Sequence, residues 1–273
     1  MSAEVHVNGR RATQEVIQYE AADGVATIWL NRPEVKNCVN WELLTNLGAA
    51  LERAEEDDDV RVVLIRGRGH TFCAGADLNM LDSEFLGTTN NSVKIAQVSA
   101  RTFDRAFNLG KPTIAVVEGH AVAGGFELMI SCDFAIAADD AKIGDFHIRR
   151  ALFGGAGPIY RVTRMIGIRK TKELMLTGKL LSGVEAADFD LINKSAPAEK
   201  LDETVEEFIG HLTDKSPFQM RITKMTIDRS LDADTQSLMV MEHLAVGNAL
   251  QSEDAAEGVA AFLEKREPKW KGR

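Results

Sequence analysis

Glu127 and His147 are the two side chains whose types and spacing could do acid–base chemistry. They lie in the stretch GGFELMISCDFAIAADDAKIGDFH, residues 124–147, where Glu127 follows two glycines and His147 ends a second largely apolar run. A carboxyl group and an imidazole with separated pKa values can act as a general base and a general acid. The imidazole suits this work near neutral pH, because its unperturbed pKa is about 6.5. We therefore take Glu127 and His147 as candidate catalytic residues.

Two glycine turns of similar design lie near these side chains in the sequence. Residues 74–76 (AGA) and 123–125 (AGG) each come between a predicted strand and a predicted helix. Small residues let a ligand approach the backbone, and free N–H groups at the start of a helix favour negative charge. If the turns face each other, two backbone N–H groups can bind one oxygen, as in an oxyanion hole. Either turn alone is equally well explained by close packing of a strand on a helix.

The elements that carry these turns follow from the apolar pattern. Apolar and β-branched runs predict strands over residues 25–30, 60–66, 111–119 and 134–138. Helical spacing predicts helices over residues 41–54, 94–108 and 124–133. The repeated order of strand, turn, helix and strand predicts an α/β fold.

Two further segments complete the predicted organisation. Residues 81–93 have weak periodicity and contain GTTNN, so we expect a mobile loop there. After about residue 201 the strand signals end, and helical patterns continue to about residue 265. We expect a core domain over 1–205 and a helical C-terminal oligomerisation region over 206–273.

The composition limits the class of function. The 273 residues are 45% hydrophobic and carry a net charge of −9, so no basic surface for nucleic acid is indicated. The three cysteines form no CxxC pair, which argues against a zinc site or a disulfide framework. No apolar run approaches the roughly 20 residues that span a bilayer, and the N-terminus does not have the pattern of a signal peptide. We expect a cytoplasmic protein with no metal, no membrane span and no redox cofactor.

Five stretches that together span most of the chain are NRPEVKN (31–37), VRVVLIRGRGHTFCAGADL (60–78), KPTIAVVEGHAVAGGFELMISCDFAIAADDAKIGD (111–145), LTGKLLSGVEAADFDLIN (176–193) and EDAAEGVAAFLEKREPKW (253–270). In these stretches the sequence resembles the crotonase family, the enoyl-CoA hydratases and isomerases, and the resemblance covers most of the chain from about Val16. It implies a crotonase-like spiral of ββα units with a helical C-terminal trimerisation region. It also implies homotrimers, commonly paired as hexamers, a role in fatty-acid and lipid metabolism, and an acyl-CoA thioester as substrate, with coenzyme A entering as part of that substrate.

The resemblance also implies roles for particular residues. The backbone N–H groups of Ala76 and Gly124 would form the oxyanion hole. The implied substrate and CoA contacts are Lys36, Ala74, Ala76, Asp77, Leu78, Asn79, Gly124, Phe262 and Lys265. Phe262 and Lys265 match tail residues that often reach the CoA nucleotide from a neighbouring subunit.

His147 is the main departure from the family pattern. The hydratases have two catalytic glutamates; the first matches Glu127, and the second would fall at position 147. Three explanations remain: His147 replaces the carboxylate, Glu127 acts alone in an altered reaction, or His147 is structural in a specialised acyl-CoA binder. Asp145 could orient the imidazole or serve as a turn residue, and the turn is favoured.

The resulting prediction is an enoyl-CoA hydratase-like lyase or isomerase that acts through an enolate. The alternatives are a crotonase-fold hydrolase of a CoA ester or C–C bond and a non-catalytic acyl-CoA binding protein. A serine protease is disfavoured, because the chain has no G-x-S-x-G motif.

Overall fold

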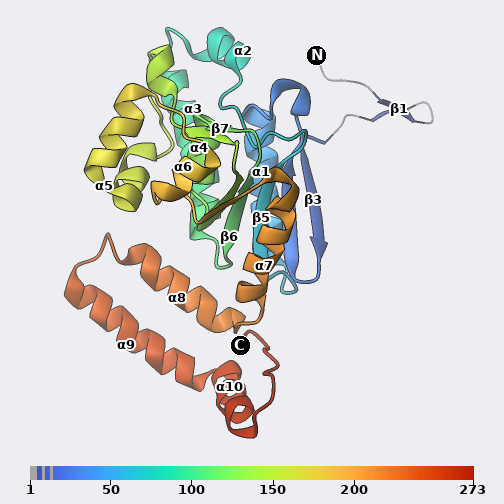
Figure 1. The fold of residues 1–273 in the computed structure, drawn as a ribbon, viewed down its shortest axis with the longest axis vertical. Helices are drawn as coiled ribbons and strands as arrows, with labels where there is room; N and C mark the ends of the chain where they lie inside the picture. Colours follow the sequence, from blue (N-terminus) through green and yellow to red (C-terminus); the bar gives the residue numbers. More distant parts are fainter. Residues whose placement is uncertain (1–4, 8–9, 13–14) are drawn as a thin grey trace.

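The computed structural model describes residues 5–7, 10–12 and 15–273, and a six-stranded sheet forms its centre (Figure 1). The strand order is β10-β8-β6-β5-β4-β3. Neighbouring strands run parallel except for the antiparallel pair β3 and β4. The strands are β3 (Ile17–Ala22), β4 (Val25–Leu30), β5 (Val62–Gly67), β6 (Thr113–Val117), β8 (Phe134–Ala138) and β10 (Lys194–Ala196). The predicted α/β class is confirmed.

Helices cover both faces of this sheet because successive side chains of its central strands point to opposite sides. On β5, Val63 and Ile65 belong to the larger core, which includes α1 (Trp41–Glu56), α3 (Thr89–Asn108) and α4 (Gly124–Met129). The alternate residues Val62 and Leu64 belong to a second core, closed by α7 (Leu201–Thr213). The sheet is therefore a buried layer whose strand ends can hold a site.

A second, two-stranded parallel sheet lies beside the strand ends. It pairs β7 (His120–Val122) with β9 (Lys142–Gly144). Two helices, α5 (Pro158–Thr177) and α6 (Gly183–Asp188), follow β9 along the chain. The remaining short elements are β1 (Val5–Val7), β2 (Arg10–Ala12), and the single turns Pro33–Val35, His147–Arg150 and Ala198–Lys200.

The prediction of a loop over residues 81–93 is wrong. A short helix, α2 (Leu78–Met80), continues into a π-helical turn over Leu81–Phe85, and α3 begins at Thr89. Tertiary contacts hold this segment: the Trp41 and Phe85 rings meet edge to face at 5.7 Å between centroids, and Trp41 Nε1 donates to Glu84 Oε2 at 2.9 Å. Local sequence periodicity carries no signal for such contacts.

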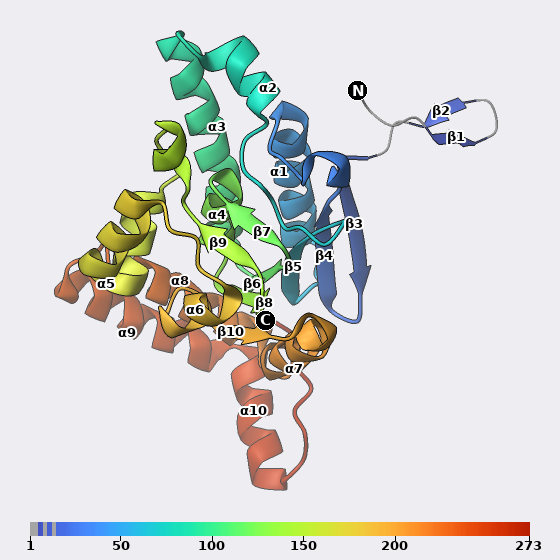
Figure 2. The same ribbon diagram turned by 45° about the horizontal axis from the view of Figure 1, so that its top comes forward.

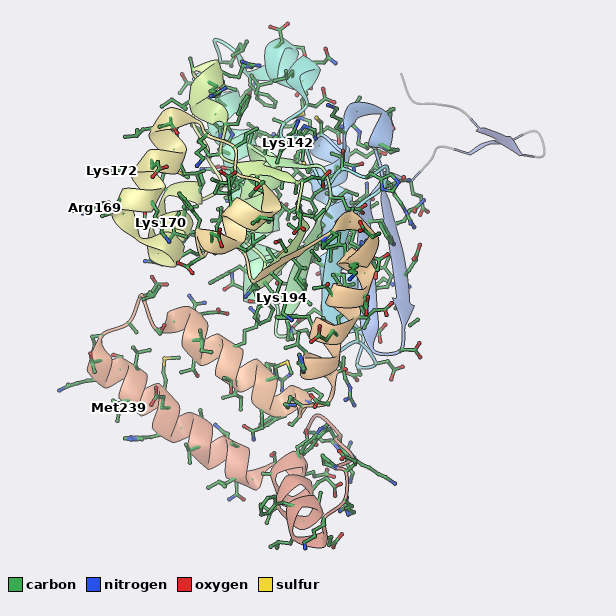
Figure 3. All side chains as sticks on the ribbon, in the orientation of Figure 1. Lys142, Arg169, Lys170, Lys172, Lys194 and Met239 are labelled. Atoms are coloured by element: carbon green, nitrogen blue, oxygen red, sulfur yellow. The ribbon has the colours of Figure 1, made fainter. Side chains whose placement is uncertain are left out.

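The C-terminal part is helical, as predicted, and consists of α8 (Pro217–Arg229), α9 (Thr235–Gln251) and α10 (Glu253–Glu264). In Figures 1 and 2, α9 lies on the side of α8 away from the sheet, and α10 lies at the end of the molecule opposite α2. No residue of α9 is buried, and Met239, labelled in Figure 3, is 47% exposed. The predicted division after residue 205 falls inside α7, and it stays a prediction.

An ion cluster joins α8 to the core. Lys224 is 9% exposed, and its Nζ lies 2.7 Å from Asp133 Oδ1 and 3.1 Å from Asp228 Oδ2. Burial raises the pKa of Asp133, and the Lys224 ammonium opposes that rise. Asp133 stands just before β8, so the cluster fixes α8 against the start of that strand.

Within the described residues, no helix combines the length and the apolar character that crossing a bilayer requires.

Candidate active site

The first glycine turn is held between two other backbone segments. The amide of Cys73 donates to His120 O at 2.7 Å, and the amide of Val122 donates back to Cys73 O at 3.1 Å. On the other side, Asp77 N donates to Val39 O at 2.9 Å, and Val39 N donates to Gly75 O at 2.8 Å. The turn between Cys73 and Asp77 is thereby fixed beside β7, which leads into the second turn.

The two glycine turns are in direct contact. A Cβ added to Gly75 would lie 3.5 Å from the backbone N of Gly124, and one added to Gly124 would lie 3.6 Å from the backbone N of Ala76. Gly75 has a φ of +102°, and Ala123 has a φ of 50° with a ψ of −120°, conformations that few L residues adopt. Among the described residues, neither Ala76 N nor Gly124 N donates to a turn or loop carbonyl. The two turns therefore face each other, which the sequence alone left open.

Glu127 lies one helical turn into α4 and is 5% exposed. Its Oε1 accepts a hydrogen bond of 2.9 Å from the backbone N–H of Ala156. Burial raises the pKa of Glu127, while the N–H groups of Ala156 and Gly155 and the nearby His147 act in the opposite direction. The carboxyl group is thus a buried acid–base group whose ionised form has hydrogen-bond support.

His147 is paired with Asp145. Its Nδ1 lies 2.9 Å from Asp145 Oδ1, and the side chains are 12% and 8% exposed. Phe146 between them has a φ of 56°, which turns the chain so that both side chains reach the same side, and His147 N donates to Asp145 O at 2.7 Å. Burial lowers the pKa of His147, but the hydrogen bond and charge of Asp145, together with the charge of Glu127, raise it above its ordinary value.

Gly154 lies between the two candidate catalytic side chains. A Cβ at this position would lie 2.8 Å from Glu127 Oε1, 3.2 Å from His147 Nδ1 and 2.6 Å from Pro158 Cγ. Glu127 and His147 therefore both pack against Gly154, at a point where even a methyl group would not fit. The structure brings together the two residues that the sequence singled out.

The other predicted contacts near the first turn lie around its rim. Ala74 N donates to Lys36 O at 3.0 Å, so exposed Lys36 sits beside the turn. Asp77 pairs with Arg32 at 3.0 Å and begins α2 by accepting from Asn79 N. Leu78, 64% exposed, and Asn79 point to the surface side of this segment.

Phe262 and Lys265 lie elsewhere. Both belong to the end of α10, which is at the opposite end of the molecule from α2 in Figures 1 and 2. Phe262 is 83% exposed. Within one chain these two residues are not brought to Glu127.

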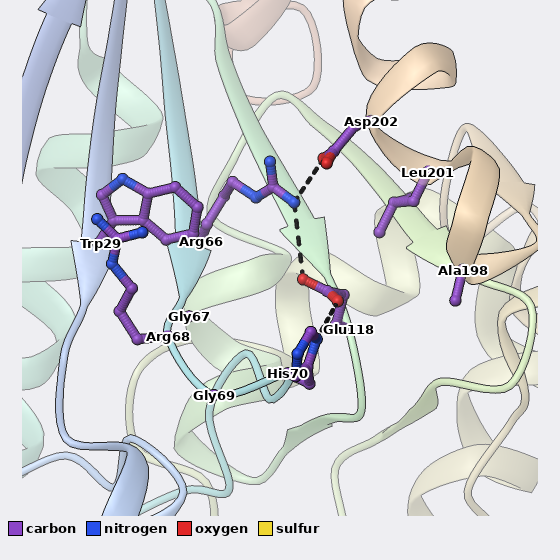
Figure 4. A pocket seen from close by; sticks show the side chains of 10 residues that line it. All are labelled: Trp29, Arg66, Gly67, Arg68, Gly69, His70, Glu118, Ala198, Leu201 and Asp202. Carbon is purple, nitrogen blue, oxygen red and sulfur yellow. Dashed lines mark hydrogen bonds and ion pairs between the residues drawn. The ribbon is translucent and has the colours of Figure 1, made fainter.

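A cleft of about 280 Å³ lies where β4, β5 and β6 end beside the start of α7 (Figure 4). Glu118 spans it: Oε1 contacts His70 Nδ1 at 2.9 Å, and Oε2 lies 3.6 Å from Arg66 Nη2, which also pairs with Asp202 at 2.7 Å. Glu127 and His147 do not line this cleft. The hydrogen bond and charge of Glu118 raise the pKa of the His70 imidazole.

Comparisons with known proteins identify the family. The family model described as enoyl-CoA hydratase/isomerase matches residues 20–273. The chain belongs to this family. It is 34% identical over 254 residues to the probable enoyl-CoA hydratase 2, mitochondrial, of Arabidopsis thaliana, covering 91% of this chain and 82% of that protein. It is 30% identical over 243 residues to a short-chain-enoyl-CoA hydratase of Clostridium acetobutylicum, covering 89% and 92%. The crystal structure of enoyl-CoA hydratase from Bacillus anthracis superposes with a TM-score of 0.89 at 32% identity, covering 94% of this chain and 100% of that one.

As a member of the enoyl-CoA hydratase/isomerase family, the protein is an enzyme with a small-molecule acyl-CoA substrate. Two contributors to its candidate site were missed by sequence reasoning. Ala156 and Gly155 donate their N–H groups to Glu127 from the glycine-rich segment FGGAGP (153–158), whose composition is the signal that could have indicated them. Among the described residues, no group of three or more His, Cys, Asp and Glu side chains could hold a metal ion.

Proposed function

We propose that this enzyme catalyses hydration or double-bond isomerisation of a 2-enoyl-CoA thioester through an enolate. The observation that carries the proposal is the contact between the two glycine turns, together with the packing of Glu127 and His147 against Gly154. A thioester oxygen bound by Ala76 N–H and Gly124 N–H gains hydrogen bonds that strengthen as negative charge develops on it. The carbon atoms next to that thioester then face Glu127 and His147.

Glu127 is the base in this proposal. Its carboxylate takes a proton from water or from a substrate carbon. The hydrogen bond of 2.9 Å from Ala156 N–H holds the carboxylate in position for this transfer. His147 handles the second proton, at the position where a glutamate is expected in the hydratases that the sequence resembles. Burial keeps both groups away from bulk solvent, which strengthens their interaction with developing charge.

A second candidate is hydrolysis of a CoA ester or of a C–C bond next to the thioester. The observation in its favour is the Asp145–His147 pair, since an imidazole oriented by a carboxylate is an effective base for activating water. This reaction would use the same oxyanion hole.

We propose further that the enzyme is a cytoplasmic homotrimer or hexamer built through its C-terminal helices. The support is an exposed apolar surface on α9, formed by Met239, Val240, Leu244, Val246 and Leu250, each at least 47% exposed. Surfaces of this kind mark protein contacts. In such an assembly Phe262 and Lys265 would reach the CoA nucleotide of a neighbouring subunit, while Lys36, Ala74, Asp77, Leu78 and Asn79 would contact CoA within the same subunit. Coenzyme A enters as part of the substrate, and no separate cofactor is proposed.

The test is an absorbance assay with short and medium 2-enoyl-CoA esters that follows loss of the conjugated enoyl thioester. Hydration predicts rapid loss that Glu127→Gln lowers by about 10² to 10⁴. The matched control is Glu173→Gln, which changes an exposed glutamate of α5 and should leave the rate unchanged. No loss with any ester, together with measurable CoA-ester binding, would reject hydration; release of free CoA thiol or of a shortened acyl-CoA would then identify the hydrolase.

A further inference from the structure

Asp145 is a buried carboxylate with one charged neighbour in hydrogen-bond contact. It is 6% exposed, and its Oδ1 contacts His147 Nδ1 at 2.9 Å. Within the described residues, no other side chain donates to this carboxylate. A buried carboxylate without a donor is costly, so the proton between these atoms belongs on Nδ1. The remaining nitrogen of the ring, Nε2, is then the one free to act on a ligand.

A second carboxylate, that of Glu127, acts on the same imidazole from a different helix. It stands on α4, and its charge acts on His147 together with that of Asp145. The loop over residues 151–157, which carries Gly154 between the two groups, has no titratable side chain. Arg149 and Arg150 follow His147, but both are exposed and lie over the Phe146 ring at 5.6 and 5.5 Å. His147 is thus a single basic group facing two carboxylates.

We propose that Asp145 is a positioning residue that keeps Nδ1 of His147 protonated and makes His147 the general acid of the site, with Nε2–H as the donor. This inference rests on the proposed function for its catalytic meaning. The structure supports opposite states for the two groups: backbone N–H donors face Glu127 and suit a carboxylate, whereas carboxylates face His147 and suit an imidazolium.

With these roles, the protons taken up and released in the hydration reaction balance. Glu127 takes a proton from water, and the hydroxide forms a C–O bond to the β-carbon. The C=C electron pair shifts to join the α-carbon to the thioester carbon, and the C=O pair moves to the oxygen to give the enolate. The enolate then takes the Nε2 proton of His147 at its α-carbon. The proton on Glu127 returns to His147 through exchange with solvent, so no oxidant, reductant or further reactant is consumed.

The first test is nitrogen NMR of the imidazoles in the full-length enzyme labelled at histidine, with His147→Gln identifying the resonances. We expect neutral His147 to carry its proton on Nδ1 and to titrate above the usual pH of about 6.5. Asp145→Asn, which keeps the side-chain shape, should move that titration to lower pH and mix the two tautomers. Glu118→Gln is the matched control, because it removes the carboxylate that contacts His70 Nδ1 at the same 2.9 Å; it should shift His70 and leave His147 unchanged.

The second test is the pH dependence of turnover. A general acid loses activity as the pH rises through its pKa, so Asp145→Asn should move the alkaline limb of kcat to lower pH. We expect kcat to fall at least about tenfold with little change in KM. A purely structural role would change KM, stability or both, and would not move this limb.

The outcomes separate the inference from the proposed function. A wild-type His147 that carries its neutral proton on Nε2, or a titration that Asp145→Asn leaves in place, would overturn the role of Asp145 even if the enzyme hydrates enoyl-CoA. An NMR result as expected, combined with no Glu127-dependent turnover of any enoyl-CoA, would retain the Asp145–His147 pair and reject the proposed reaction. The wild-type tautomer is decisive by itself, and His147→Gln serves only to assign its resonances.

Discussion

Gly124→Ala should lower activity and Gly125→Ala should lower stability, although the two glycines are adjacent. A Cβ on Gly124 meets nothing closer than 3.6 Å, an ordinary contact, but it would stand next to Ala76 N, where the thioester oxygen is proposed to bind. A Cβ on Gly125 would lie 2.1 Å from Cys73 O and 2.7 Å from Cys73 C, and both of these are backbone atoms. The first change therefore affects the ligand site, and the second affects the fold.

The expected magnitudes follow from these distances. Gly125→Ala forces the Cys73 backbone to move by more than about 1 Å, which breaks its pairing with β7, and overpacking of this kind costs about 3 kcal/mol. For a chain of this size, that lowers Tm by roughly 6 to 12 °C. Gly124→Ala should change stability by less than about 1 kcal/mol, since it replaces glycine at a helix start without a clash. It should reduce kcat/KM by about 10² to 10³, the usual effect of losing one oxyanion-hole donor.

Thermal unfolding followed by circular dichroism and the enoyl-CoA absorbance assay measure these effects on the same samples. The comparison is internal, because both variants add one methyl group to neighbouring positions of α4. A Gly124→Ala enzyme with full activity would refute the oxyanion role of this turn. A Gly125→Ala protein with an unchanged Tm would refute the packing argument.

Three further predictions concern buried ionisable groups. In calorimetry at pH 8, Glu127→Gln should unfold at the same or a higher temperature than wild type. The pKa of the Glu127 carboxyl is raised in the folded state, so its ionised form destabilises the fold. The higher unfolding temperature of the variant should vanish as the pH falls towards about 4, where wild-type Glu127 takes up a proton. Lys224→Met should lower the free energy of unfolding by about 3–5 kcal/mol in denaturant titration, because it leaves Asp133 buried without its ion-pair partner. Burial raises the pKa of Asp133, so this loss of stability should be largest at high pH and should shrink as the carboxyl takes up a proton. Thiol titration should find three reactive cysteines in the denatured chain but at most Cys38 in the folded one, because burial raises the pKa of Cys73 to about 12 and also raises that of Cys132.

The strands and most helices could be predicted because their signals are local. Residues 25–30 form a strand with those same bounds, and the Asp-Gly pair before it makes the turn of the β3–β4 hairpin, with φ values of 51° and 81°. The partner strand β3 was missed although this turn indicated it. The start of α3 was missed for a different reason: the first turn of this helix is exposed, so its sequence needs no apolar period.

The candidate site was predicted in its parts, but its internal contacts were not. Glycine spacing indicated the two turns, but it did not show that they are in contact, as they are in the structure. The sequence favoured a turn role for Asp145, whereas the structure pairs its carboxylate with His147. The pairing depends on the left-handed conformation of Phe146, which a phenylalanine seldom adopts and the sequence does not indicate. The support of Glu127 by Ala156 N–H depends on the path of a glycine-rich loop, and backbone donors leave no mark in a residue pattern.

His147 and Asp145 together conserve the charge of the glutamate pair implied by the family resemblance. Two glutamates that share one proton carry a net charge of −1. Ionised Glu127, protonated His147 and ionised Asp145 also sum to −1 and also hold one transferable proton. A glutamate at 147 alone would instead place a third carboxylate beside two others, and the excess negative charge disfavours ionisation of Glu127.

This balance predicts a coupled effect of two substitutions. His147→Glu alone should give a weak hydratase with its pH optimum displaced upward, because excess negative charge favours protonated Glu127, which is no longer a base. His147→Glu combined with Asp145→Gln removes the third carboxylate and should recover activity beyond the product of the two single effects, as residues in contact do. The measurement is a double-mutant cycle in kcat/KM over pH 5–9. Additive effects of the two changes would mean that Asp145 does not share its charge with position 147, and that the histidine replaces the glutamate without help from its neighbour.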